Sequence, residues 1–147
     1  MPGDRRGDLP SPEVCAGLRQ AGYELVHRLG EGGMGELWAA ARLGAHGAVK
    51  PCVLKTIRPA LAGDARCRRL LIDEGRVGML LGHANLVSAF DLCLADERPF
   101  LAMDWVDGVD LATLGPRACR RVTGPLDVAD AVHVAGALLD ALSYLHG

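Results

Sequence analysis

The sequence is short of lysine, of aromatic residues and of any excess charge. Its 147 residues include 18 acidic and 16 basic side chains, and only 4% are aromatic. A net charge of -2 excludes strong long-range attraction to nucleic acid or to an anionic membrane. Only Lys50 and Lys55 are lysines, against 14 arginines, so each lysine is a candidate for a specific role.

Cysteine pairs and long apolar runs are missing as well. Five cysteines without a CxxC pair argue against a disulfide framework or a zinc site and favour scattered cytosolic thiols. No apolar run approaches the roughly 20 residues that a bilayer crossing needs. Arg5-Arg6 precedes glycine, aspartate and proline rather than the apolar stretch of a signal peptide. We therefore expect a cytoplasmic protein with no metal site in this chain.

What is present suffices for one compact domain in which strands come first and helices later. Residues 1–20 are rich in proline, glycine and charge and are predicted to form a flexible leader, with at most a short turn at 13–20. Strands are predicted at 23–29, 36–42, 48–57, 85–94 and 99–104, and helices at 64–81, 111–114 and 127–146. The last helix carries an apolar stripe with no later partner, so the domain is expected to be incomplete.

Glycines recur as Gly30-x-Gly32-x-x-Gly35 between the first two predicted strands. A Rossmann unit would place a helix after such glycines, and a Walker A loop would continue as Gly-Lys-Ser/Thr; neither follows here. The tip of a hairpin can fold over phosphates, because glycines let backbone N–H groups approach without a Cβ clash. An ordinary mobile hairpin turn is the alternative interpretation.

Lys55 and Glu74 form the second candidate feature. Strand alternation places Lys55 on one face with Val53 and Ile57, the face that would cover a core or cleft. A lysine buried there needs an anionic partner, which Glu74 supplies from the middle of the first long helix. Alternatively, Lys55 lies exposed on an edge strand and Glu74 is a solvated helix residue.

Together these features resemble the N-terminal lobe of the bacterial serine/threonine protein kinases related to the eukaryotic enzymes. The glycine motif is Leu29-Gly-Glu-Gly-Gly-Met-Gly-Glu-Leu37, the lysine motif is Cys52-Val-Leu-Lys55, and Glu74 lies where the αC glutamate belongs. Three later segments are also similar to the family, in the same order: Leu81-Gly-His83-Ala-Asn85-Leu-Val87, Phe100-Leu-Ala-Met103-Asp-Trp-Val-Asp-Gly108 and Ala141-Leu-Ser-Tyr-Leu-His146.

The resemblance implies an α+β, protein-kinase-like fold that is truncated. A five-stranded antiparallel sheet with the αC helix would be followed by a hinge and by the αD and αE helices of an incomplete C-lobe. The implied organisation is a leader at 1–20, an ATP-binding N-lobe at 21–103, a hinge at 104–110 and the start of the C-lobe at 111–147.

The resemblance also implies roles for individual residues, with ATP as the bound nucleotide. Lys55 would bind the α- and β-phosphates, and Glu74 would hold Lys55 in place. The glycine loop would cover the phosphates through Gly30, Glu31, Gly32, Gly33 and Gly35. The adenine and ribose would be met by Leu29, Leu37, Val53, Val87, Met103, Asp104, Val106 and Asp110. Val53 replaces the usual alanine and would narrow the adenine slot, and Asp110 could instead cap the helix at 111–114.

The family's catalytic loop, H-R-D-x-x-x-x-N, and its D-F-G motif have no counterpart in the sequence. Mg²⁺ is expected for a full-length kinase, but its ligands are missing here, so the chain alone is expected to be inactive. The main hypothesis is the ATP-binding part of a kinase that acts on a protein Ser/Thr substrate. A non-catalytic nucleotide-binding or interaction module, with self-association through the αE stripe, is the alternative, and a small-molecule phosphotransferase is a weaker third.

Overall fold

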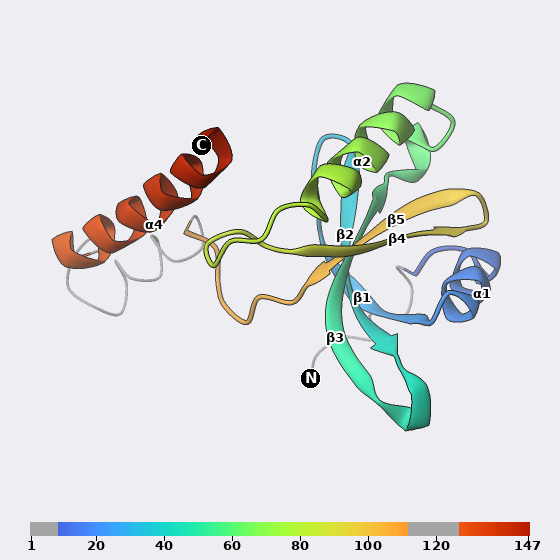
Figure 1. Cartoon of the computed structure of the whole chain (residues 1–147). Coiled ribbons are helices and arrows are strands. Elements are labelled where there is room, and N and C mark those ends of the chain that lie inside the picture. Colours follow the sequence, from blue (N-terminus) through green and yellow to red (C-terminus); the bar gives the residue numbers. More distant parts are fainter. Residues whose placement is uncertain (1–8, 112–126) are drawn as a thin grey trace. The chain divides into compact units, whose positions relative to one another are not determined.

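The computed structural model describes residues 9–111 and 127–147 and contains a five-stranded antiparallel sheet in the order β1-β2-β3-β5-β4 (Figure 1). This confirms the predicted fold class. The strands are β1 (Tyr23–Glu31), β2 (Gly35–Leu43), β3 (Val49–Ile57), β4 (Ala89–Ala95) and β5 (Arg98–Asp104). The helices are α1 (Pro12–Gln20), α2 (Ala65–Gly78) and α4 (Val128–His146), with short 3-10 turns at Ala45–Gly47 and Pro59–Leu61.

The chain divides into two compact units. The first comprises Met1–Leu81 with Ser88–Trp105 and contains the sheet, α1 and α2. The second comprises Gly82–Val87 with Val106–Gly147 and contains α4. The predicted helix at 111–114 lies, apart from Leu111, outside the described residues.

Helix α1 covers one face of the sheet, which we call the outer face. Val14 and Leu18, four residues apart on α1, are fully buried against this face. Gly17 permits the close approach, because a Cβ there would meet Ala95 at 3.1 Å. The prediction of a flexible leader through residue 20 is therefore wrong for Pro12–Gln20, since burial on the sheet stabilises a helix too short to form alone. The sheet residues of this core are Tyr23, Trp38, Ala40, Cys52, Leu54, Ala95, Phe100 and Ala102.

Two titratable groups of the first unit are held neutral on β1 and β4. The Tyr23 hydroxyl donates a 2.5 Å hydrogen bond to the Asp91 carboxylate. Burial, reinforced by this bond, raises the pKa of Tyr23 above its usual value near 10. Burial likewise raises the pKa of the Cys93 thiol to about 11. Charging either group would therefore oppose folding.

Helix α2 covers the opposite, inner face. The Asp64 carboxylate caps α2 by accepting hydrogen bonds from the amides of Arg66 and Cys67, and these bonds lower its pKa. Glycine is a poor helix former, but packing explains its presence at position 75 in α2. A Cβ at Gly75 would lie 2.9 Å from the Leu101 side chain. The inner core consists of Ile57, Cys67, Leu71 and Leu101.

Helix α4 belongs to the second unit and buries little of its surface. Among its described residues only Ala141 is buried. By length and composition alone α4 could cross a membrane, with a mean hydropathy of 1.3, contrary to the expectation of no such run. Core helices of soluble proteins often meet the same criterion, so this is weak support for a span. The exposed apolar residues of α4 include Val128, Val132, Leu138, Leu139, Leu142 and Leu145.

Candidate functional site

The register of β3 places Lys55 on the inner face of the sheet. Lys55 pairs with Leu37 of β2 and with Leu101 of β5, and Leu101 belongs to the inner core. Leu54, which lies between Val53 and Lys55 in the strand, is fully buried in the outer core on the opposite face. Strand alternation then puts Val53 on the same side as Lys55, as the sequence predicts.

Lys55 reaches across to α2 and contacts Glu74. Its Nζ lies 2.6 Å from Oε1 and 2.7 Å from Oε2 of the Glu74 carboxylate. The sequence suggested a buried lysine, but the pair is not buried: the Lys55 and Glu74 side chains are 31% and 48% exposed. Solvent screens such a pair, so it adds little stability, and its main physical effect is to fix where the ammonium group lies.

The glycine-rich turn closes with its tip amides unpaired. The Gly32 N–H donates to the Gly35 carbonyl at 2.8 Å, joining the ends of the turn. The amides of Gly33 and Met34, which lie between them, have no hydrogen-bond partner among residues 9–111 and 127–147. Successive amides of this kind can accept an anionic group such as a phosphate.

The glycines of the turn differ in the space around them. A Cβ added at Gly30, Gly32 or Gly33 would meet no atom within 4 Å, so that side of the turn is open. At Gly35 a Cβ would lie 2.9 Å from the Thr56 carbonyl oxygen of β3 and 3.6 Å from Lys55 Cε. The third glycine is therefore required by the fold itself, and it lies beside the lysine. Unpaired backbone amides and an ammonium group are both donors of the kind that bind phosphate oxygens.

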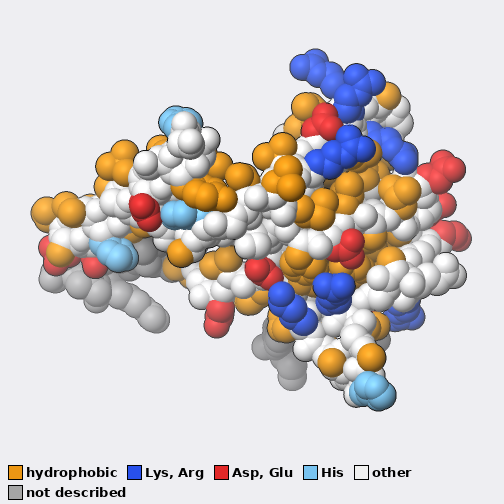
Figure 2. Space-filling model, in the orientation of Figure 1, with side chains coloured by type: hydrophobic (Ala, Val, Ile, Leu, Met, Phe, Trp, Pro, Cys, Tyr) orange, Lys and Arg blue, Asp and Glu red, His pale blue; other side chains and the backbone are white. Residues whose placement is uncertain are grey.

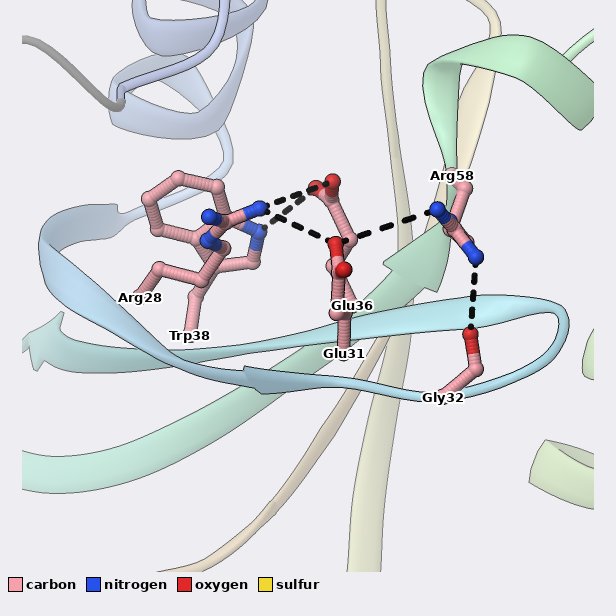
Figure 3. Close-up of polar contacts among 6 residues, drawn as sticks. All are labelled: Arg28, Glu31, Gly32, Glu36, Trp38 and Arg58. Carbon is pink, nitrogen blue, oxygen red and sulfur yellow. Dashed lines mark hydrogen bonds and ion pairs between the residues drawn. The ribbon is translucent and has the colours of Figure 1, made fainter.

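A polar cluster occupies the outer face of the β1–β2 hairpin (Figure 3). Arg28 Nη1 lies 3.2 Å from Glu31 Oε2 and 3.7 Å from Glu36 Oε1, and the Trp38 indole donates to Glu36 at 3.3 Å. Arg58, just after β3, lies 3.9 Å from the same Glu31 oxygen. We call these five residues, Arg28, Glu31, Glu36, Trp38 and Arg58, the hairpin cluster. The sequence analysis missed it, although Glu36 and Trp38 alternate with Leu37 and so must face away from Lys55.

The residues predicted to meet the adenine are divided between the two units. Leu29 and Leu37 are partly exposed in the first unit, and Met103 packs against its inner core. Asp104 donates its backbone N–H to the Ser88 carbonyl at 3.0 Å, so only its carbonyl could meet an adenine.

Three further predicted site residues, Val87, Val106 and Asp110, belong to the second unit. Their positions relative to Lys55 stay predictions.

Asp104 belongs to the first unit, and its carboxylate is held by Lys50, whose Nζ lies 2.8 Å away.

The second unit contains a network that the sequence analysis also missed. Asn85 donates to the Ala137 carbonyl of α4 at 3.0 Å, and His83 Nε2 lies 3.3 Å from an oxygen of Asp140. The His83 ring stacks on Tyr144 with centroids 5.1 Å apart, and the Tyr144 hydroxyl accepts from the Gly82 amide. These contacts join the segment after α2 to α4.

Among the described residues, no group of three or more His, Cys, Asp or Glu side chains lies where it could hold a metal ion.

No protein-family model matches the sequence. Individual relatives do match: serine/threonine-protein kinase Pkn1 of Myxococcus xanthus is 33% identical over 139 residues, covering 94% of this chain and 18% of the relative. Tyrosine-protein kinase MasK of Myxococcus xanthus is 34% identical over 125 residues, covering 84% of this chain and 19% of the relative. The chain thus spans about a fifth of the length of these relatives.

Solved structures are similar to the chain as well. The kinase domain of Mycobacterium tuberculosis PknI superposes with a TM-score of 0.62 at 31% identity, covering 86% of this chain and 48% of that one. The sheet, the Lys55–Glu74 pair and these similarities lead to one assignment. The chain is a homologue of bacterial serine/threonine protein kinases, and its fold matches about half of the PknI kinase domain.

Proposed function

We propose that this chain binds ATP as the nucleotide-binding part of a serine/threonine protein kinase. The observation that carries the proposal is the contact of Lys55 Nζ with both oxygens of Glu74, on the face of the sheet where Gly35 meets Lys55. An ammonium group fixed beside a turn with unpaired amides is complementary to a phosphate chain.

Each part of the first unit would act on a different part of the nucleotide. Lys55 would bind the α- and β-phosphates, Glu74 would hold it in position, and the amides of the glycine turn would accept phosphate oxygens. Leu29, Leu37, Val53 and Met103 would contact the adenine. Val87, Val106 and Asp110 would complete the adenine and ribose contacts from the second unit.

The chemical step is proposed only for a protein that also contains the catalytic-loop and D-F-G motifs. Mg²⁺ would supply neutralisation of the phosphate charge in such a protein, and the 147 residues by themselves would bind nucleotide without transferring phosphate. The substrate would be a protein Ser or Thr side chain, and the location cytoplasmic. The alternative is a non-catalytic kinase-like module. Sequencing the DNA that follows the Gly147 codon distinguishes the two, since a kinase requires both motifs.

The test is ATP binding to the 147-residue chain, measured by calorimetry. Lys55→Met should abolish binding, because it removes the cation beneath the glycine turn; Glu74→Gln should be milder, because the charge remains. Arg69→Met, an exposed arginine of α2, removes the same charge elsewhere and is the matched control. Unchanged ATP affinity in Lys55→Met, with the protein still folded, would refute the proposal.

A further inference from the structure

The hairpin cluster joins the glycine-rich turn to the end of β3 through Arg58. Its guanidinium Nη1 donates to the Gly32 carbonyl at 3.4 Å, and Nη2 lies 3.9 Å from Glu31 Oε2 (Figure 3). Its backbone N–H donates to the Met34 carbonyl at 3.0 Å. One residue thus contacts two carbonyls and one carboxylate of the same turn.

The hydrogen bond from Arg58 to the Gly32 carbonyl also fixes the direction of the Gly33 N–H. The peptide between Gly32 and Gly33 is planar and trans, so its C=O and its N–H point in opposite directions. When Arg58 engages the Gly32 carbonyl, the Gly33 N–H must point away from Arg58. That amide is one of the two that have no partner among the described residues.

The acidic residues of the hairpin explain why an arginine is needed there. Glu31 lies within the glycine turn, and Glu36 is buried nearby with only 8% of its surface exposed. Two carboxylates would repel an anionic ligand and each other. Arg28 lies within 4 Å of both carboxylates, and Arg58 contacts Glu31, so the acids also hold the guanidinium groups in place.

We propose that Arg58 is a positioning residue that directs the Gly33 amide toward the phosphate groups of the nucleotide, with Glu31, itself held by Arg28, holding Arg58 in place; this rests on the proposed function. The forked guanidinium can span a carbonyl and a carboxylate together, which a lysine ammonium cannot do with the same geometry. Arg58 would therefore affect ligands that carry phosphates and not those that lack them.

The experiment compares ATP with adenosine on the 147-residue chain by calorimetry. Arg58→Gln should weaken ATP binding about three- to tenfold, the effect of one net hydrogen bond. Adenosine affinity should change less than twofold, since adenosine does not reach the turn. Arg69→Gln, which removes an exposed positive charge from α2, should alter neither. The amide resonance of Gly33, followed by NMR without ligand, should shift in Arg58→Gln and not in Arg69→Gln.

Three results would overturn the proposal. Equal loss of ATP and adenosine affinity in Arg58→Gln would show a general loss of structure. Full retention of ATP affinity in Arg58→Lys would show that charge alone matters. An unmoved Gly33 resonance in Arg58→Gln would show that the peptide is not held by the side chain. If the unsubstituted chain binds no ATP, the proposed function fails, and the Gly33 resonance alone then decides whether Arg58 orients the peptide.

Discussion

Two glycines of the same hairpin should respond in opposite ways to the same substitution. Gly30 pairs with Leu37, and Gly35 pairs with Ile57, so both positions lie on the inner face, with Lys55. A Cβ at Gly30 would meet no atom within 4 Å, whereas at Gly35 it would lie 2.9 Å from the Thr56 carbonyl oxygen. Gly30→Ala and Gly35→Ala are therefore a matched pair that differs mainly in the space available.

The expected changes in the free energy of unfolding follow from these contacts. An alanine restricts the unfolded chain and adds about 0.4–1 kcal/mol of stability where the folded backbone accepts it. At Gly30 that gain should remain. At Gly35 the clash is with a backbone oxygen that cannot rotate away, and such overpacking costs typically about 1–3 kcal/mol. The two variants should thus differ by roughly 2 kcal/mol, about 30-fold in the unfolding equilibrium.

Urea unfolding without nucleotide measures this difference. Trp38 is buried in the outer core, so its fluorescence in a Trp105→Phe background reports on the sheet. With an m-value of about 2 kcal/mol/M, the midpoints of the two variants should lie about 1 M apart. ATP calorimetry then separates an effect on stability from an effect on ATP binding. Gly30→Ala should weaken ATP binding although the protein remains stable.

Two results would refute this reasoning. Equal destabilisation by both alanines would mean that the space above Gly30 is filled in solution. Undiminished ATP affinity in Gly30→Ala would mean that the nucleotide does not lie over this face of the turn.

The remaining predictions concern Val53 on the inner face, the packing of α1, the stability of the fold at alkaline pH and the exposed surface of α4. Val53→Ala should leave ATP affinity unchanged or increase it while Val53→Phe blocks binding, and equal affinity in all variants by calorimetry would contradict the placement of Val53 beside the adenine. Leu18→Ala should lower the free energy of unfolding by about 2–5 kcal/mol, against less than about 1 kcal/mol for the exposed Leu70→Ala, and urea unfolding checks this. Because the folded state holds Tyr23 neutral with a raised pKa, stability should fall as the pH rises above about 10, and Tyr23→Phe should flatten that fall in urea titrations. The exposed apolar residues of α4 should make the chain self-associate in light scattering, which Leu139→Gln with Leu142→Gln should reduce; a monodisperse monomer of the unsubstituted chain would contradict this.

Local patterns predicted those parts of the fold that depend on neighbours in sequence. Alternation along β3 predicted the face on which Lys55 lies, and the helix predicted at 64–81 overlaps α2. Helix α1 could not be predicted in the same way, because only Val14 and Leu18 mark its buried face. Its stability comes from Trp38, Phe100 and the other sheet residues that it covers, and these lie far away in sequence. The exposure of Lys55 was also unpredictable, since it depends on what covers the inner face.

The hairpin cluster shows why strand alternation alone could not predict which side chains of β1 share a face. In a regular strand Arg28 and Glu31, three residues apart, would lie on opposite faces. The pairing of β1 with β2 shifts between Leu25 and His27 and again between Arg28 and Gly30. The first shift sets Arg28 opposite Trp38, and the second sets Glu31 opposite Glu36, so both side chains reach the outer face.

The same irregularity places Gly30 opposite Leu37 on the Lys55 face. A bulge arises from pairing between two strands and has no simple signature in one of them. With regular pairing continued from Leu25, Arg28 would lie opposite Leu37 on the Lys55 face, and Leu29 would lie opposite Glu36. The two bulges therefore move the arginine to the outer face and leave a glycine beside the lysine. This places the acids and arginines of the hairpin on the outer face and leaves the open side of the turn available to the proposed nucleotide.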